Sequence, residues 1–376
     1  MAAALAEEGW HDPPPSTTSR IRSCARVVLW RGVAYDVGTD FGWGVSTRPS
    51  FSPDLTRREL EIVGRDLHCN AVKIGGRDPA RIAAAAAQAL ELGLEVWFSP
   101  ALFEKSPSDT LRFIVDAARV AETVRGIGRD KLVFCLGQEL TLFMRGILPG
   151  HNLLQRFKDP ANKEIIRTGS HRPQLNAFLA QASSTVREVF QGPVTYAALP
   201  WEGVDWSPFD MAGVDHYWDV RIQDRYLEML QPFFASGKPV VVTGTGSRAY
   251  QGAHSTGTLG FGVIDPRTLF LHTLPLVGRF IRPRLKGSYV RDEGEQARRL
   301  TQVLSLLDEA HVAGVFVDTF VEYNSPYSED PRYDLDMSAL SLVKTYERGR
   351  GTTYPEMSWE PKQAFRAVAK YYSTES

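Results

Sequence analysis

The stretch NAVKIGGRDPARIAAAAAQALELGLEVWFSP, residues 70–100, contains one complete strand–helix–strand unit. Its two ends, Asn70–Gly75 and Leu94–Pro100, are short apolar runs of the kind found in strands buried on both faces of a parallel sheet. Between them, Asp78-Pro79 predicts the start of a helix, and Gly93 predicts its end. Parallel strands need such a crossover, which is almost always right-handed. We therefore expect this unit to be one repeat of an α/β fold.

The same alternation continues on both sides of this unit. The eight predicted strands are Arg31–Gly38, Asn70–Gly75, Leu94–Pro100, Leu132–Gly137, Pro193–Ala198, Met211–Tyr217, Pro239–Thr243 and Val312–Phe320. The predicted helices are Thr56–Leu67, Asp78–Leu92, Ser108–Val124, Pro173–Phe190 and Asp292–Ala310. Strand and helix repeated eight times predict a closed (β/α)8 TIM barrel. An open, doubly wound sheet is the alternative, but Gly38–Gly44 lacks the G-x-G-x-x-G phosphate turn that such a fold would favour.

The length of 376 residues would allow two or three domains of roughly 150 residues, but α/β barrels often exceed that size as one domain. We predict a disordered N-terminal segment over residues 1–25 and a single barrel domain over residues 26–376. Three long connections, Thr141–Arg172, Ser247–Glu295 and Glu322–Met357, follow the fourth, seventh and eighth strands. Loops after barrel strands build the active-site face, so we expect the site there.

Composition limits the classes of partner. The 43 basic and 44 acidic side chains give a net charge of −1, which argues against nucleic acid binding. No window approaches the ~20 apolar residues of a membrane span, and the first residues lack the features of a signal peptide. The cysteines (Cys24, Cys69 and Cys135) form no disulfide framework or metal pair, and the histidines show no metal-site spacing. We therefore expect a cytoplasmic protein with a small-molecule substrate, no cofactor, no metal and no membrane partner, whose oligomeric state the sequence does not indicate.

Glu139 is the strongest catalytic candidate. It follows the fourth predicted strand directly after Gln138. A carboxyl group at the top of a barrel strand in apolar surroundings has a raised pKa and can act as a general acid. The alternative is a structural Glu139 that pairs with a loop arginine such as Arg145.

Strands one and six also end in acidic and aromatic residues. The sixth closes with Asp215-His216-Tyr217-Trp218-Asp219, a cluster typical of a wall that binds polyols or aromatic ligands, although a lone histidine is usually structural. We predict that Glu139, Asp318 and His216 are catalytic. The predicted substrate-binding residues are Asp36, Asp40, Trp43, Lys73, Gln138, Tyr217, Trp218, Asp219, Thr243, Thr245 and Glu322.

From about Val33 to Tyr372 the chain resembles the clan A glycoside hydrolase superfamily. More narrowly, it is similar to bacterial barrel proteins labelled abortive-infection-like. The shared runs are YDVGTDFGWG (35–44), DLHCNAVKIGGRDP (66–79), ELTLFMRG (139–146), GVDHYWD (213–219) and DLDMSALSLVK (334–344). The resemblance implies that Glu139 protonates a glycosidic oxygen. It also implies a nucleophilic glutamate at the end of strand seven, where this chain has Gly244.

The glycine at position 244 limits what the resemblance implies. A retaining glycosidase needs two carboxyl groups about 5–5.5 Å apart, whereas an inverting enzyme holds them about 6.5–9.5 Å apart and uses the second as a base. Gly244 has no side chain, although a Gly-Thr-Gly turn would leave room for a bulkier or anionic ligand. Asp318, Glu322 or Asp219 could supply the second acid, or the substrate could supply its own nucleophile.

We therefore expect a glycoside hydrolase-like enzyme that uses Glu139 as a general acid/base on a glycosylated or polyhydroxylated small molecule. A non-hydrolytic step of specialised metabolism, such as an elimination, isomerisation or cyclisation, also fits a lone acid. The alternative is a catalytically dead barrel that binds a ligand or acts as a phage-defence interaction protein. The basic run Arg279–Lys286 is interpreted as a solvated loop; if it faced the pocket, it would favour a carboxylate or phosphate on the ligand.

Overall fold

The computed structural model describes residues 29–40, 46–128, 130–255, 262–274 and 276–374. Its eight parallel strands form a closed barrel in sequence order, and β1 pairs with β8 to complete it. The strands are β1 (Trp30–Asp36), β2 (Ala71–Gly76), β3 (Glu95–Pro100), β4 (Leu132–Gln138), β5 (Val194–Ala198), β6 (Ala212–Asp215), β7 (Val240–Thr245) and β8 (Gly314–Val317). The predicted (β/α)8 TIM barrel is confirmed, and each observed strand lies in or overlaps a predicted run. The predicted disordered segment 1–25 lies outside the described residues.

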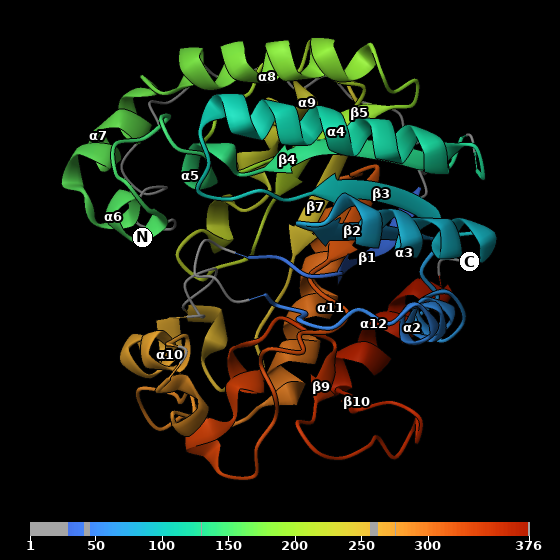
Figure 1. The fold of residues 1–376 in the computed structure, drawn as a ribbon, viewed down its shortest axis with the longest axis vertical. Coiled ribbons are helices and arrows are strands. Elements are labelled where there is room, and N and C mark those ends of the chain that lie inside the picture. The colour runs from blue at the N-terminus through green and yellow to red at the C-terminus, as the bar shows by residue number, and fades with distance from the viewer. Residues whose placement is uncertain (1–28, 41–45, 129, 256–261, 275, 375–376) are drawn as a thin grey trace.

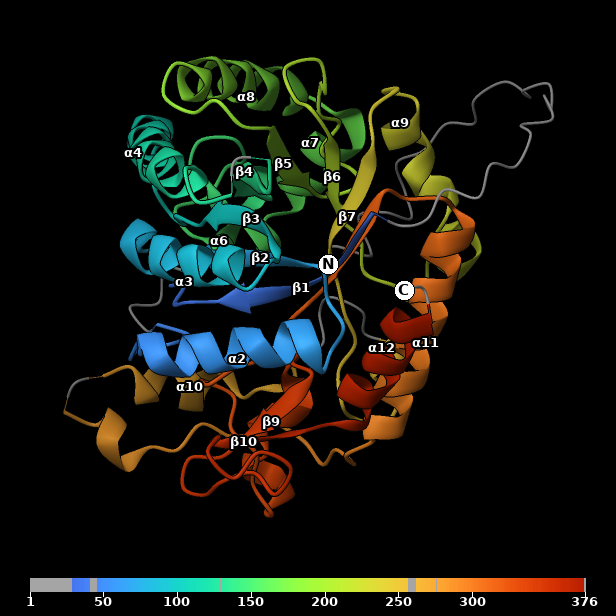
Figure 2. The same cartoon turned by 90° about the vertical axis from the view of Figure 1, so that its right-hand side faces the viewer.

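Helices surround the barrel (Figures 1 and 2). The longer ones are α2 (Pro53–Arg65), α3 (Pro79–Glu91), α4 (Pro107–Arg125), α8 (Arg172–Arg187), α11 (Glu293–Glu309) and α12 (Gln363–Thr374). Ser52, Asp78 and Ser106 cap the first three with side-chain hydrogen bonds, and a proline follows each cap. This cap and proline order fixes the helix start, because the proline nitrogen needs no hydrogen-bond partner there. Helix α12 was not predicted from the sequence; it lies beside α11 in both views.

The regular alternation breaks in the second half of the barrel. No helix joins β5 to β6 within the described chain, and only η1 (Gln223–Arg225), η2 (Glu228–Leu230) and α9 (Gln231–Phe234) join β6 to β7. The expectation of a helix after every strand was therefore wrong here. Aromatic side chains provide the packing instead: Trp206 lies 5.6 Å from Phe209 and 5.8 Å from Phe233 between ring centroids. Buried aromatic rings can cover a barrel face without a regular helix.

The three long connections lie on the side of the barrel where the strands end. After β4 come α5 (Leu140–Phe143), α6 (Leu153–Lys158) and α7 (Pro160–Thr168). After β7 come η3 (Ala253–Ser255), α10 (Pro266–His272) and η5 (Gly278–Phe280). After β8 come η6 (Pro331–Tyr333), η7 (Leu335–Ser338) and a hairpin of β9 (Val343–Thr345) and β10 (Trp359–Pro361). Figure 1 shows α5, α6, α7 and α10 on the same, left-hand side of the barrel, which we call the mouth.

An apolar layer fills the lower interior of the barrel. It consists of Ala71, Trp97, Val133, Met211, Val241 and Phe316. The Trp97 ring lies between Trp30 and Phe316, at centroid distances of 5.7 and 4.9 Å. The barrel is therefore a packed core below its mouth and not an open pore. No helix in the described part of the chain is long and apolar enough to span a membrane.

Candidate active site

The polar residues of the mouth lie one layer above the apolar floor. Side chains of a strand alternate between the two faces, so a residue two positions beyond an interior residue also points inward. Two residues after Ala71, Val241 and Phe316 come Lys73, Thr243 and Asp318. The sequence carries a signal for this layer: on these three strands an apolar inward residue is followed, two positions later, by a polar one.

Lys73 and Asp215 form a buried ion pair in this layer. The Lys73 Nζ lies 3.9 Å from Asp215 Oδ1, and the side chains are 6% and 4% exposed. Thr243 donates a hydrogen bond of 2.7 Å to the same Asp215 oxygen. Burial lowers the pKa of Lys73, but Asp215 and Asp318 outweigh it and hold that pKa above its usual value. Lys73 therefore stays charged and balances the carboxylates, which argues against a neutral amine nucleophile.

Asp318 and Tyr217 form a second pair beside the first. The Tyr217 hydroxyl donates a hydrogen bond to Asp318 Oδ2. Burial raises the pKa of Asp318, while the Lys73 charge and the Tyr217 hydrogen bond oppose that rise. Asp318 and Tyr217 are both half-buried, so ligand can reach this pair more easily than Asp215.

Gly244 lies directly against these two pairs. A Cβ atom at residue 244 would lie 2.8 Å from Asp215 Oδ1, 3.0 Å from Asp318 Oδ2 and 3.1 Å from the Tyr217 hydroxyl. The expectation that glycine leaves room for a bulkier ligand was therefore wrong at this point. The space that a residue 244 side chain would enter is occupied by Asp215 of β6, by Asp318, which follows β8, and by the Tyr217 hydroxyl. Asp215 was not predicted as a site residue, because the catalytic role was assigned to its neighbour His216.

Glu139 stands on a tight turn at the end of β4. Its backbone is left-handed, with φ of 48° and ψ of 41°, a conformation that few residues other than glycine adopt. Its N–H donates to the carbonyl of Ala197 at 2.9 Å. The next N–H, of Leu140, donates to the Tyr196 hydroxyl at 2.6 Å, and that of Thr141 donates to Glu202 Oε1 at 3.0 Å. These bonds hold the turn that aims Glu139 at the mouth.

Glu202 is the buried support of this turn. It also accepts hydrogen bonds from the Tyr196 hydroxyl, at 3.0 and 3.1 Å, and from the Leu199 N–H at 2.8 Å. Burial raises the pKa of Glu202 to about 7, although these donors oppose the rise. Neither Glu202 nor Tyr196 was predicted as a site residue, because neither lies at a strand end next to a recognisable motif.

The Glu139 carboxyl group has the environment of a general acid. Burial raises its pKa well above the usual value, and the charges of Asp215 and Glu202 raise it further. Arg145, the predicted structural partner, has its Nε 3.7 Å from Glu104 Oε2 instead. No hydrogen bond joins the Glu139 carboxyl group to any residue in the described part of the chain. A protonated, half-buried and unengaged carboxyl group can donate its proton to a ligand.

Three residues that follow β6 and were predicted to be catalytic or to bind substrate lie away from this cluster. His216 stacks on Tyr226 at 4.0 Å between ring centroids, its Nε2 lies 2.8 Å from the Tyr226 carbonyl oxygen, and burial lowers its pKa to about 4. Trp218 is buried, with the Arg299 guanidinium 3.8 Å from its ring centroid. Asp219 is bound by Arg221 at 2.5 Å. The geometry therefore supports neither a catalytic His216 nor ligand binding by Trp218 or Asp219.

The first strand contributes polar residues with local partners. Asp36 accepts hydrogen bonds from Thr39 at 2.7 Å and Thr47 at 2.5 Å, and burial raises its pKa against their effect. Asp40 pairs with Arg77 at 3.0 Å. Trp43, predicted to stack on the ligand, lies outside the described residues.

The remaining predicted residues differ in how close they come to the cluster. Gln138 is half-buried at the end of β4, next to Glu139. Thr245 is fully buried. Burial raises the pKa of the Tyr226 hydroxyl, and the Thr245 side chain opposes that rise. Glu322 accepts a hydrogen bond of 2.7 Å from the Leu340 N–H and so fixes the loop after β8. The contacts of Thr245 and Glu322 therefore favour structural roles for both residues.

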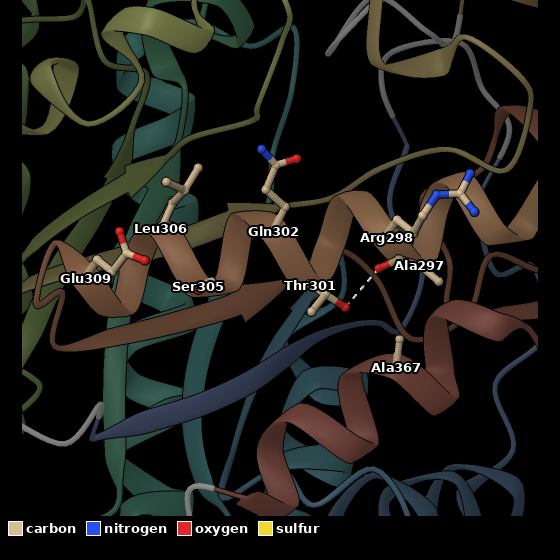
Figure 3. A pocket seen from close by; sticks show the side chains of 8 residues that line it. All are labelled: Ala297, Arg298, Thr301, Gln302, Ser305, Leu306, Glu309 and Ala367. Atoms are coloured by element: carbon tan, nitrogen blue, oxygen red, sulfur yellow. Dashed lines mark hydrogen bonds between the residues drawn. The ribbon is translucent and has the colours of Figure 1, made fainter.

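Two further features bear on what the site can bind. Among the described residues, no group of three or more His, Cys, Asp or Glu side chains is placed to hold a metal ion. An open groove runs along the outside of α11, bordered by Ala367 of α12 (Figure 3). Its charged residues, Arg298 and Glu309, lie at opposite ends of this helix face in Figure 3. The groove therefore brings no reactive groups together.

Comparison with known proteins supports the same class of fold. No family model and no curated protein sequence matches the chain. A GH113 β-mannanase from Alicyclobacillus acidocaldarius has a TM-score of 0.56 and 16% identity over 94% of this chain and 100% of its own. A second GH113 β-1,4-mannanase has a TM-score of 0.56 and 12% identity over 92% of this chain and 99% of its own.

A β-glucuronidase from Parabacteroides merdae has a TM-score of 0.55 and 11% identity over 92% of this chain, but over only 36% of its own length. These neighbours share the (β/α)8 TIM barrel fold with this chain. At such low identities the similarity concerns the fold and assigns no substrate.

Proposed function

We propose that this protein is an enzyme that acts on a glycosylated or polyhydroxylated small molecule, with Glu139 as its general acid. One observation carries the proposal. Glu139 is half-buried at the barrel mouth with a raised pKa, and it faces a cluster of two aspartates, a lysine and a tyrosine. Protonation of a leaving oxygen by such a carboxyl group typically contributes about 10²–10⁴-fold to the rate.

Asp318 is the proposed second acid. Asp215 is 4% exposed and bound by Lys73 and Thr243, whereas Asp318 is half-buried and bound by the Tyr217 hydroxyl. Asp318 can therefore accept a proton from water that attacks the sugar carbon while Glu139 protonates the leaving oxygen. This reaction needs no side chain at residue 244 and inverts the anomeric configuration.

The structural neighbours support a carbohydrate substrate, since those proteins are described as mannanases and glucuronidases. Three parts of the proposal rest on the sequence alone. They are the narrower likeness to abortive-infection-like barrels, a cytoplasmic location and a role in specialised metabolism. Buried, unpaired Cys69 and Cys135 fit a reducing compartment.

The test is a hydrolysis assay of the purified protein with aryl glycosides, including mannosides and glucuronides. Proton NMR of the first product identifies its anomer, and inversion is expected. Asp318→Asn should abolish turnover, whereas Asp210→Asn, at the opposite end of the barrel, should not. Retention of configuration would refute the proposed role of Asp318. Turnover without water consumption would indicate an elimination, isomerisation or cyclisation instead.

A ligand-binding protein without turnover is the second candidate, and Gly244 favours it. The residue at this position carries no carboxylate, and its surroundings leave no space for one. The two candidates differ in one result: Glu139→Gln should remove turnover from an enzyme and keep ligand affinity. A binding protein would show affinity but no turnover in either form.

A further inference from the structure

The exposed apolar residues of this chain gather in one segment. Of the large apolar side chains exposed in the described residues, most lie between residues 270 and 290. Leu276 is 81% exposed, Phe280 75% and Phe270 58%. Large apolar side chains that stand together in water usually mark an interaction surface.

These residues stand on a compact helical hairpin made of α10 and η5. The Gly278 N–H donates to the Leu274 carbonyl at 2.7 Å, and the His272 Nδ1 lies 2.7 Å from the Ile281 carbonyl oxygen. A Cβ atom at Gly278 would lie 2.0 Å from the His272 carbonyl oxygen, so only glycine permits this close return of the chain. The hairpin is thus a folded unit that presents its apolar side chains outward.

The hairpin is anchored at the mouth by its two ends. Ile264 and Leu285 form an antiparallel bridge, and the Leu285 N–H donates to the Arg332 carbonyl at 2.8 Å. Below the bridge, Val263 and Leu285 pack in an apolar cluster with Tyr250, Ala253, Leu335 and Met337. Val263 and Leu285 at the anchored ends are buried, whereas most of residues 270–274 and 276–280 are exposed. Figure 1 shows α10 at the edge of the mouth side, separated from α6 and α7.

The charge of this segment is entirely basic. Residues 266–291 contain Arg and Lys but no Asp or Glu. Arg282 and Arg284 find acids outside the segment, Glu347 at 3.8 Å and Asp265 at 3.6 Å. Arg267, Arg279 and Lys286 are exposed, and none forms an ion pair with a residue in the described ranges. The Arg279 guanidinium lies 4.6 Å from the Phe280 ring centroid, so cation and aromatic ring stand together.

We propose that the α10–η5 hairpin docks this protein onto an anionic lipid surface. Exposed Leu and Phe side chains insert into the headgroup and acyl boundary, and flanking cations bind the anionic headgroups. A second copy of the hairpin fits poorly as a partner, because two acid-free segments repel each other. The surface is also a projecting tip, which suits a deformable bilayer better than a preformed protein groove. This proposal departs from the expectation of no membrane partner, which rested on the absence of a membrane span, because peripheral docking needs no span.

The test is flotation of the full chain with vesicles of phosphatidylcholine alone or mixed with phosphatidylglycerol. We expect binding to the anionic vesicles only, at low salt, and release at high salt because exposed charges are screened. Removing two cations in Arg267→Gln/Arg279→Gln should weaken binding by about 30-fold, from about 1 kcal/mol per cation near the surface. Leu276→Ser/Phe280→Ser should abolish binding.

The matched control is Ile127→Ser/Leu154→Ser, which removes apolar side chains that are 52% and 53% exposed elsewhere on the molecule. It should bind like the wild type. Absence of binding to anionic vesicles, or an equal loss in the control, would overturn the proposal. A dimer in sedimentation that Leu276→Ser/Phe280→Ser dissociates would replace the lipid with a second copy. The assay needs no turnover, so its result is independent of Glu139.

Discussion

Two glutamates of this barrel, the buried Glu59 and the half-buried Glu139, differ in how many hydrogen-bond donors surround them. Glu59 on α2 is 0% exposed and accepts hydrogen bonds from Arg48 at 2.9 Å and Trp359 at 3.0 Å. The hydroxyls of Tyr35 and Tyr323 add two more, each at 2.5 Å. Glu139 has no hydrogen-bond donor among the described residues, and burial, together with acidic neighbours, raises its pKa.

The comparison separates a structural carboxylate from a reactive one. Donors from β1, the turn before α2, the β8 loop and β10 saturate both Glu59 oxygens, so this group joins distant parts of the chain. Such saturation leaves no oxygen free for a ligand. Glu139 keeps both oxygens available, and its raised pKa favours the protonated form, a perturbation typical of functional groups.

The largest expected effect is on activity. Glu139→Gln should lower kcat by about 10²–10⁴-fold, because the amide cannot donate the acid proton. The raised pKa of Glu139 should place an alkaline limb in the pH profile of the wild type, since activity falls as this acid ionises. The variant should lack that limb and keep its Tm. A lowered Tm together with an unchanged pH profile would make Glu139 structural, like Glu59.

Glu59→Gln should give the opposite pattern. Loss of its charge leaves Arg48 buried without a counter-ion, which typically costs about 3–5 kcal/mol of stability. Urea unfolding should measure this loss, and the rate per folded molecule should stay close to that of the wild type. A stable but inactive variant would place Glu59 in the reaction and remove the distinction.

A smaller effect is expected at Gly244. Gly244→Ala would place a Cβ atom within 3.1 Å of Asp215, Asp318 and Tyr217. Overpacking of this kind costs about 1–3 kcal/mol and should also displace Asp318. Gly75→Ala is the control, since its Cβ would meet the Ser99 carbonyl oxygen at an ordinary 3.7 Å. Equal stability of the two variants would mean that the acids beside Gly244 move aside freely.

The smallest expected effect is the pH dependence due to Glu202. Its folded pKa of about 7 lies above the unfolded value of about 4.3, so its contribution is complete below the unfolded pKa and is lost as pH rises through 7. The unfolding free energy should fall by about 1 kcal/mol between pH 6 and 8 from this group alone. Comparison with Glu202→Gln isolates the effect, and parallel pH curves would contradict the raised pKa.

The barrel could be predicted from the sequence because its strands and helix starts carry local signals. Apolar runs and cap-proline pairs such as Asp78-Pro79 require no knowledge of distant contacts. The position of Glu139 followed from the end of β4 in the same way. The missing helix after β5 could not be predicted, because Trp206 and Phe209 replace it through packing with Phe233, a long-range contact.

The composition of the candidate site was harder to predict. Strand alternation puts Asp215 and Tyr217 on one side of strand six and His216 on the other, but residue type favoured histidine as the reactive group. The pairing of Tyr217 with Asp318 joins residues far apart in sequence, and no local pattern announces it. The hydrogen bonds by which Tyr196 and Glu202 hold the Glu139 turn could not be predicted either, since they depend on how β5 lies beside β4.

The buried Lys73 among acids has a consequence for inhibitor choice. The cluster sets two aspartate side chains against the single Lys73 ammonium, so the mouth favours cations. The positive charge that develops on a sugar ring during glycosidic cleavage would be stabilised there. Sugar mimics with a protonated ring nitrogen should therefore bind more tightly than neutral sugars of the same shape. Uronic acids should bind more weakly, and this pocket would select its ligands by charge as well as by hydroxyl pattern.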